Sequence, residues 1–221
     1  MADEQAPIGL LGGTFDPIHF GHLRCGLELY EALGLAEVRF IPVRQPPHRD
    51  VPAAGPEQRL AMVSAAVEDV DGLAVDAREL RREGPSYTVD TLHSFRDELG
   101  GFPLCLILGA DAFAGLPGWH RWREIPDLAH IIVARRPGWS GEMPDELSEL
   151  LEARRAEGPE ELRREPAGRI LFWTVTRLEI SSTAIRRGVA RGLSPRFLVP
   201  DRVCGLIGEL GLYRKREGAA R

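Results

Sequence analysis

Residues 12–23 of this chain read Gly12-Gly13-Thr14-Phe15-Asp16-Pro17-Ile18-His19-Phe20-Gly21-His22-Leu23. The apolar run at residues 8–11 before them predicts a buried strand. After them, Leu23, Leu27 and Tyr30 recur at helical spacing, and Gly34 is expected to end that helix. The stretch is therefore predicted to be a glycine-rich turn between a strand and a helix whose first turn contains His22.

This turn has the properties of a phosphate-binding site. A helix start presents unpaired backbone N–H groups and the positive end of the helix dipole. Gly12 and Gly13 carry no side chains, so a ligand can approach the backbone closely. His19 and His22 are separated by two residues, one of them glycine, so both imidazoles can converge on one anion. We predict a nucleotide-phosphate site with two histidines in place of a lysine.

Two other interpretations of the histidines are weaker. In the first interpretation, His19 and His22 are ordinary residues at the start of a helix. In the second, zinc is bound by His19, His22 and Cys25, which recur every three residues. No fourth ligand and no second Cys/His pair stands at a zinc-site spacing, so we predict that the protein supplies no metal ligands. The glycines alone form neither a dinucleotide fingerprint nor a Walker-type loop.

The composition indicates a cytoplasmic protein with one sizeable domain. The chain has 221 residues, of which 43% are hydrophobic and 28% charged. Its net charge of -5 argues against nucleic acid as the main partner. The start of the chain lacks an apolar signal core and no run approaches transmembrane length, so no membrane partner is expected. The three cysteines are far apart and are expected to be reduced.

Lysine is almost absent from the sequence. Lys215, close to the C-terminus, is the only one, and every other basic side chain is arginine. A covalent adenylyl-lysine or Schiff-base intermediate is therefore not expected, because the nucleophile would have to come from the end of the chain. Arginine, by contrast, grips phosphate with a planar fork of donors.

Strands and helices are expected to alternate along the chain. The apolar runs that predict further strands are residues 38–43, 73–75, 104–108, 130–134 and 170–173. This alternation predicts an α/β fold, a doubly wound parallel sheet with helices on both faces, in a single domain covering residues 1–221. A helical segment at about residues 182–213 is expected to end it.

The segment at about residues 140–169 differs from the rest in character. It holds nine acidic and five basic residues, with a helix-like patch at Leu147, Leu150 and Leu151. We predict that it is a solvated excursion from the main sheet.

Several polar segments follow predicted strands. Pro46-Pro47-His48-Arg49 is a stiff loop where open α/β sheets bind ligands, or else a mere connector. Asp111 follows an apolar strand and either caps the next turn or faces a ribose or a metal. Ser86 or Thr88 can cap a helix, which by itself needs no function.

Two further segments can contact a nucleotide. Trp119 lies beside a glycine-proline loop and either covers the core or stacks on a flat ligand ring. Ser181 and Ser182 stand at a predicted helix start, where they cap the helix and can also donate to phosphate. Arg186 follows one helical turn later and reaches the same region.

These segments together resemble the bacterial nicotinate-nucleotide adenylyltransferases of the nucleotidylyltransferase superfamily. The motifs that carry the resemblance, in order, are the histidine stretch, Pro46-Pro47-His48-Arg49, Ser86-Tyr87-Thr88, Gly109-Ala110-Asp111, Trp119, Arg135-Arg136-Pro137-Gly138 and Ile180-Ser181-Ser182-Thr183. They cover nearly the whole chain. His120 departs from the pattern, because a tyrosine is common at its position.

The resemblance implies a Rossmann-like nucleotidyltransferase fold and a specific reaction. The enzyme would transfer AMP from ATP to nicotinate mononucleotide, giving deamido-NAD and pyrophosphate in NAD biosynthesis. The attack would be direct and in line, with no covalent enzyme intermediate. Mg2+ would be bound mainly through the ATP phosphates, and homo-oligomerisation is left open.

The resemblance also implies which residues perform the reaction. The catalytic residues would be His19, His22 and Arg186. ATP would contact Gly12, Gly13, Thr14, Phe15, His19, His22, Gly109, Asp111, Ile180, Ser181, Ser182 and Arg186. The mononucleotide would contact Arg49, Ser86, Tyr87, Thr88, Trp119, His120 and Arg136.

Two alternative functions remain at this point. Pantetheine-phosphate adenylyltransferases share the histidine motif and the Ile-Ser-Ser-Thr stretch, but they are shorter and their substrate loops find no match here. A nucleotide-sensing regulator would keep the pocket without turnover. The loss of a motif His or Arg would favour that reading, and none is lost.

Overall fold

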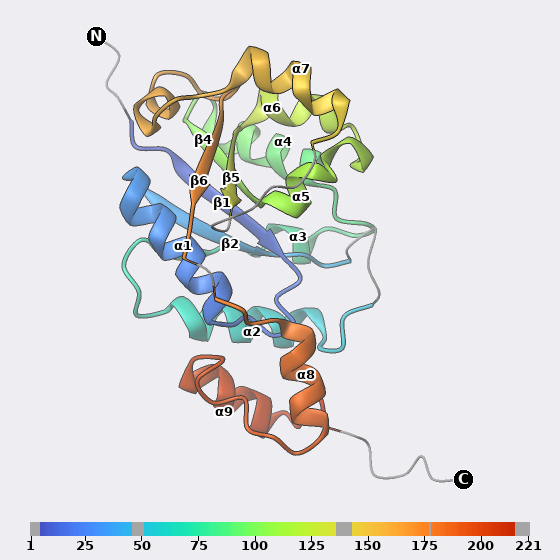
Figure 1. Cartoon of the computed structure of the whole chain (residues 1–221). Coiled ribbons are helices and arrows are strands. Elements are labelled where there is room, and N and C mark those ends of the chain that lie inside the picture. Colours follow the sequence, from blue (N-terminus) through green and yellow to red (C-terminus); the bar gives the residue numbers. More distant parts are fainter. Residues whose placement is uncertain (1–4, 46–50, 136–142, 177, 215–221) are drawn as a thin grey trace.

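The protein is built around one six-stranded parallel sheet. Our computed structural model describes residues 5–45, 51–135, 143–176 and 178–214 (Figure 1). The strands pair in the order β3-β2-β1-β4-β5-β6. Their bounds are β1 Ile8–Gly13, β2 Glu37–Pro42, β3 Leu73–Val75, β4 Leu104–Gly109, β5 His130–Arg135 and β6 Ile170–Thr174. All five pairings are parallel, so the predicted doubly wound sheet is confirmed.

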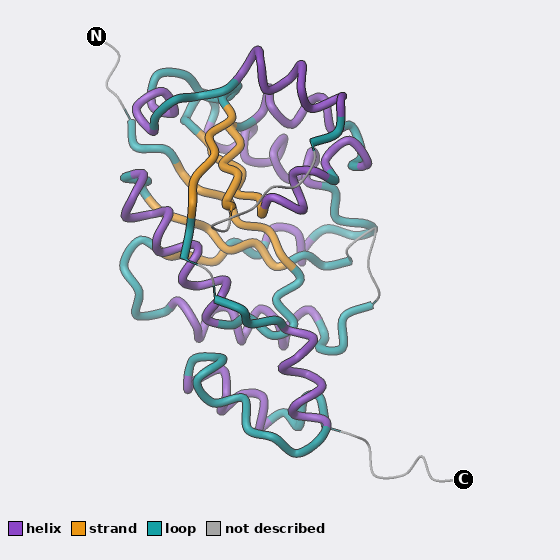
Figure 2. Tube along the Cα trace, in the orientation of Figure 1, coloured by secondary structure: helices purple, strands orange, loops and turns teal. Residues whose placement is uncertain are grey.

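Helices cover both faces of this sheet, as Figure 2 shows with the strands between two layers of helix. The helices are α1 Phe20–Leu33, α2 Pro56–Val67, α3 Arg78–Arg81, α4 Thr88–Leu99, α5 Ala110–Ala114, α6 Ile125–Leu128, α7 Asp145–Arg154, α8 Ser182–Ala190 and α9 Asp201–Glu209. Short 3-10 turns occur at Leu116–Gly118, Trp122–Glu124 and Pro159–Arg163. One core packs α1, α2 and α9 against the sheet, and the other packs α4 to α7.

The strand order reverses beside β1. In sequence order the chain builds β1, β2 and β3 outward on one side, then returns to add β4 next to β1. Because parallel strands all point the same way, the ends at Gly13, Pro42 and Gly109 lie along one edge. Ligands of open α/β sheets bind at this edge, where the strand order reverses.

Helix α1 buries a slightly different face from the predicted one. Leu23 is buried as expected, but Gly26 and Leu29 complete the inner stripe, while Leu27 and Tyr30 are only partly buried. The reason is close packing, since a Cβ at Gly26 would lie 2.7 Å from the Phe40 ring of β2. The predicted end of the helix is confirmed, because Gly34 caps it with φ 58°.

The charged segment after β5 is not a solvated excursion, and that prediction was wrong. Within its described part, Leu147 of α7 is fully buried in one core and Leu162 in the other. The Ala156 N–H donates to the carbonyl of Ile170 at 2.9 Å, so the segment covers the outer edge of β6. Arg163 donates to the carbonyl of Gly34 at 2.8 Å, behind α1. The charged side chains of this segment face the solvent, while its few leucines pack into the two cores.

The C-terminal helices form the lower layer of Figure 1, beyond α2. Val203 and Ile207 of α9 and Leu212 after it are buried in the core that contains α1 and α2. The C-terminal segment is thereby attached to the face of the sheet that carries the histidine turn. Among the described residues, no helix is long and apolar enough to cross a membrane.

Candidate nucleotide-binding site

The turn between β1 and α1 is shaped by its glycines. A Cβ at Gly13 would lie 2.8 Å from the Phe15 ring, and one at Gly21 would lie 3.0 Å from the His19 ring. These two glycines therefore make room for the rings. Gly12 differs, because its exposed position has no atom within 4 Å of where a side chain would begin. The space next to Gly12 is open to a ligand.

The two histidines of the turn form a stacked pair. Their ring centroids are 3.7 Å apart with an interplanar angle of 21°, and the edge of the Phe15 ring meets His22 at 5.1 Å. Both Nδ1 atoms are buried and have no hydrogen-bond partner in the described part of the chain. Buried polar atoms are nearly always paired in folded proteins, so these two nitrogens are expected to pair with a bound ligand or an ordered water.

Burial keeps both imidazoles neutral in the free protein. It lowers the pKa of His19 from 6.5 to about 4, and burial together with the neighbouring His19 lowers the pKa of His22 to about 3. A neutral imidazole has one N–H to donate, and a bound polyanion would favour the protonated form. Binding of a triphosphate is therefore expected to draw protons onto this pair.

The lowered pKa values predict acid sensitivity. Below about pH 6.5 the unfolded chain protonates both histidines, while the folded one does so only near pH 4 and 3. The free energy of unfolding should then fall by about 5 kcal/mol between pH 6.5 and 4, with a little under 3 kcal/mol from each histidine. Urea unfolding at several pH values measures this, and a His19→Gln/His22→Gln variant should lose less stability over the same range. An equal loss in both proteins would contradict the assignment.

The start of α8 packs against the histidine turn. Ser182 Oγ donates to the carbonyl of Pro17 at 2.9 Å, and Arg186 Nη1 donates to the carbonyl of Asp16 at 2.7 Å. Ser181 caps α8 by accepting from the Ala184 N–H, as predicted. The Ile180 carbonyl would lie 3.7 Å from a Cβ at Gly21. The structure thus brings the Ile180–Arg186 segment to the turn, although Ser182 and Arg186 use these donors to hold it.

A series of hydrogen bonds connects the histidine turn to Ser86, Tyr87 and Thr88, the segment predicted to bind the mononucleotide. We call this the acceptor segment. The Val43 N–H donates to the carbonyl of Gly13 at 2.9 Å, just beyond β2. Two residues later, the Ser86 N–H donates to the carbonyl of Gln45 at 3.1 Å, and the Arg44 N–H donates to Ser86 Oγ at 3.3 Å. The carboxyl ends of β1 and β2 and the start of α4 are therefore fixed to one another.

The acceptor segment has a different helix cap from the predicted one. Tyr87 is the N-cap residue of α4 and makes no side-chain cap hydrogen bond, so neither Ser86 nor Thr88 caps the helix. The Ser86 hydroxyl is occupied by the Arg44 N–H instead. The Tyr87 ring lies 4.4 Å from that of His120, which joins two predicted acceptor-binding segments. Trp119 is partly buried against the core beside them.

The remaining predicted site residues fall into two groups. Gly109 ends β4 and has open space at its Cβ position, and the exposed Asp111 lies in the first turn of α5. The α5 cap residue is Gly109, so Asp111 does not cap that turn and stays a candidate for contact with a ligand. Arg49 and Arg136 lie outside the described residues.

Sequence reasoning did not single out two buried charged residues beneath the turn. Asp16 is 3% exposed and accepts hydrogen bonds from the N–H groups of Ala53 and Ala54 at 2.7 and 3.1 Å. Arg59 is 0% exposed and donates to the carbonyls of Thr14, Val43, Arg44 and Ala54. A signal for Arg59 was available, because it occupies the same helical stripe as the apolar residues Met62, Val63, Ala66 and Val67.

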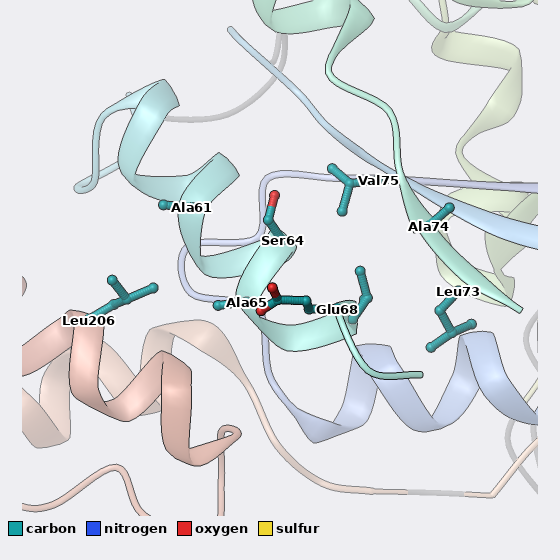
Figure 3. A pocket seen from close by; sticks show the side chains of 9 residues that line it. Ala61, Ser64, Ala65, Glu68, Leu73, Ala74, Val75 and Leu206 are labelled. Atoms are coloured by element: carbon teal, nitrogen blue, oxygen red, sulfur yellow. The ribbon is translucent and has the colours of Figure 1, made fainter. Parts of the chain in front are cut away.

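A separate groove of about 530 Å3 lies between α2, β3 and α9 (Figure 3). Its lining includes Ala61 and Ala65 of α2, Leu73 and Val75 of β3, Leu206 of α9, and the polar side chains of Ser64 and Glu68. Its lining is mostly small and apolar and lacks the histidine turn, so it is not the nucleotide site. Among the described residues, no group of three or more His, Cys, Asp or Glu side chains can hold a metal ion.

The sheet topology and the histidine turn at its switch point define a nucleotide-binding α/β protein of the nucleotidyltransferase type. Residues 10–188 match the cytidylyltransferase-like family. A protein of Halorhodospira halophila, described as a probable nicotinate-nucleotide adenylyltransferase, is 55% identical over 213 residues, covering 96% of this chain and 98% of that protein. One of Methylococcus capsulatus with the same description is 52% identical over 209 residues, covering 94% of this chain and 100% of the relative. The chain belongs to the nicotinate-nucleotide adenylyltransferase family.

The likeness extends to solved structures. A nicotinic acid mononucleotide adenylyltransferase of Plasmodium falciparum, solved in complex with NaAD, has a TM-score of 0.71 to this chain. It is 14% identical, and the superposition covers 95% of this chain and 98% of that chain. At this identity the likeness bears on the fold alone, and it agrees with the six-stranded parallel sheet.

Proposed function

We propose that this protein transfers AMP from ATP to nicotinate mononucleotide, giving deamido-NAD and pyrophosphate in NAD biosynthesis. The observation that carries the proposal is the stacked histidine pair, whose two buried Nδ1 atoms have no partner within the described residues, beside the open position at Gly12. The hydrogen-bonded line from Gly13 to Ser86 supports a binding site for the mononucleotide beside the proposed phosphate site. The names of the relatives agree with both substrates.

The proposed mechanism is a direct in-line displacement. A 5′-phosphate oxygen of the mononucleotide attacks the α-phosphorus of ATP, a new P–O bond forms, and the bond from the α-phosphorus to the β-bridging oxygen breaks. Pyrophosphate leaves with the electron pair. The attacking phosphate is already largely dianionic at neutral pH, because its second pKa is about 6, so no general base is required. Positioning and stabilisation of charge then account for the rate.

The residues take distinct parts in this proposal. His19, His22 and the backbone of residues 12–15 bind the ATP phosphates at the start of α1. Ile180, Ser181, Ser182 and Arg186 approach from the start of α8 and the residues just before it, while Gly109 and Asp111 face the nucleoside. Ser86, Tyr87, Thr88, Trp119 and His120 hold the nicotinate ring and carboxylate, and Arg49 and Arg136 hold the acceptor phosphate.

We propose that Mg2+ is bound mainly through the ATP phosphates. The described residues form no group of three or more side chains suited to a metal, whereas Mg2+ is commonly bound through substrate phosphates with few protein ligands. When bound, the ion neutralises charge on the leaving pyrophosphate. The protein's own donors at the histidine turn do the same for the α- and β-phosphates.

Release of pyrophosphate tests the function. Purified protein with MgATP is offered nicotinate mononucleotide, nicotinamide mononucleotide or phosphopantetheine in parallel reactions. We expect rapid release with the first acceptor and formation of deamido-NAD in equal amount. Turnover of phosphopantetheine would favour the related adenylyltransferases, and ATP binding without turnover of any acceptor would favour a nucleotide sensor.

We expect kcat/KM for nicotinate mononucleotide to exceed that for the amide by at least about a hundredfold. The start of α4 offers N–H groups and the positive end of a dipole to a carboxylate. The neighbouring Ser86, Tyr87, Thr88, Trp119 and His120 include no Asp or Glu to accept from an amide NH2. That NH2 would therefore face donors, a mismatch costing on the order of 1–3 kcal/mol.

Steady-state kinetics with both acceptors measure this preference. Trp119→Ala is the matched control, because loss of a stacking ring should weaken both acceptors and leave their ratio within about threefold. Equal kcat/KM values for acid and amide in the wild-type protein would contradict the assignment and indicate dual specificity.

A further inference from the structure

Tyr213, close to the C-terminus, is hydrogen-bonded to the phosphate turn near the start of the chain. Its hydroxyl donates to Asp16 Oδ1 at 2.7 Å, across 197 residues of sequence. Burial, followed by the charge of Asp16, raises the pKa of the phenol, so the hydroxyl keeps its proton at neutral pH. The ring packs against the core that contains α1, α2 and α9.

Asp16 collects hydrogen bonds from several parts of the chain. Besides Tyr213, its carboxylate accepts from the N–H groups of Ala53 and Ala54, which precede α2. Its backbone carbonyl accepts from Arg186 of α8 at 2.7 Å, and Arg186 Nη1 lies 3.9 Å from Asp16 Oδ2. At 3% exposure the carboxylate has almost no water to replace a lost donor.

Because Asp16 lies next to the histidines in the turn, its hydrogen bonds can influence the orientation of the His19 and His22 rings. Asp16 follows Phe15, which has φ 47° and whose ring touches His22. It precedes His19 by three residues, and the carbonyl of the intervening Pro17 is held by Ser182. The path of the backbone through Asp16 therefore fixes where both imidazoles point.

We propose that Tyr213 is a positioning residue for the ATP phosphates: by donating to Asp16 it holds the turn in the shape that presents His19 and His22. The inference rests on the proposed function, because it names a further residue acting on the same site. It assigns Tyr213 no contact with substrate. The C-terminal segment beyond α9 thus completes a site formed at the start of the chain.

Tyr213→Phe tests this proposal, because it removes one hydroxyl and keeps the ring. We expect the dissociation constant for ATP, measured by calorimetry, to rise about tenfold. The value of kcat/KM for ATP should fall by a similar factor, and the KM for the mononucleotide should stay within about twofold. This split separates a positioning role from a loss of stability, which would lower the fraction of folded protein and leave the KM values unchanged.

Ile207→Val is the matched control. Ile207 is buried in α9 on the same segment, and this substitution typically lowers stability to a small extent without altering any polar contact. Its affinity for ATP should equal that of the wild type at a comparable fall in Tm. A Tyr213→Phe protein that matches Ile207→Val in all three constants would overturn the proposal.

A double-mutant cycle shows whether Tyr213 acts through Asp16. In an Asp16→Ala background, adding Tyr213→Phe should change the ATP dissociation constant by less than about twofold, because the acceptor is already gone. A further tenfold loss would contradict the route through Asp16. If Asp16→Ala does not fold, the comparison of the single Tyr213→Phe variant with Ile207→Val still decides.

The test also separates this inference from the proposed function. Wild-type protein that binds ATP but releases no pyrophosphate with any acceptor would refute the function. The calorimetric comparison of Tyr213→Phe with wild type would still decide the inference. Full turnover by the wild type with no change in ATP affinity in Tyr213→Phe would refute the inference alone.

Discussion

Replacing His22 with alanine is expected to lower kcat by about a hundredfold to a thousandfold, the effect seen when one preorganised donor to transition-state charge is lost. The ring lies in the first turn of α1, stacked on His19, and its buried Nδ1 has no partner within the described residues. A neutral imidazole held in this way is ready to stabilise phosphate oxygens as charge develops. Single-turnover measurements of deamido-NAD formation isolate this step from product release.

His93→Ala is the control for the histidine substitution. His93 lies on α4 and faces Glu124 at the protein surface, so its loss should leave kcat within about twofold. The His22→Ala protein should fold normally, because no hydrogen bond of its Nδ1 within the described chain is lost. If a folded His22→Ala protein turned over at the wild-type rate, His22 would have no role in catalysis.

Arg59→Met is expected to lower the free energy of unfolding by about 3–5 kcal/mol. The guanidinium is 0% exposed and donates to four backbone carbonyls, in Thr14, Val43, Arg44 and Ala54. Methionine fills similar volume but leaves these buried or half-buried carbonyls without their donors, at a cost of up to about 1–3 kcal/mol each before relaxation. The charge that faces Asp16 is also lost. Urea unfolding at neutral pH measures the difference.

Arg24→Met provides the comparison at an exposed position. Arg24 pairs with Glu28 one turn along α1, and its side chain is 44% exposed, so its loss should cost less than about 1 kcal/mol. Arg59→Lys should fall between Arg59→Met and the wild type, because one ammonium keeps the charge but cannot reach all four carbonyls. A loss below about 1 kcal/mol for Arg59→Met would show that water replaces the guanidinium.

The sequence alone determined the sheet and the phosphate turn, because both depend on local patterns. Apolar runs of strand length alternate with helical stripes, and this alternation predicts a doubly wound parallel sheet. Within residues 12–23, the glycines that admit the rings and the histidines that stack are neighbours in sequence. The sequence spacing of these glycines and histidines was therefore enough to predict that the two imidazoles lie together. The burial of Leu147 and Leu162 escaped this reasoning, because the charges around them dominate the local composition.

Only the tertiary structure decided which distant residues hold the turn in place. Tyr213, Arg186 and Arg59 reach the Thr14–Asp16 backbone or the Asp16 carboxylate from three different helices or their ends. Tyr87 likewise meets His120 across the start of α4. The sequence does not indicate the partners in these contacts, because each contact joins residues far apart in sequence through one hydrogen bond or one ring contact. The apolar stripe that contains Arg59 indicates that this side chain is buried, but not which carbonyls it meets. They form because packing of α2, α8 and α9 on the sheet buries Asp16, and a buried carboxylate must find donors wherever the fold brings them.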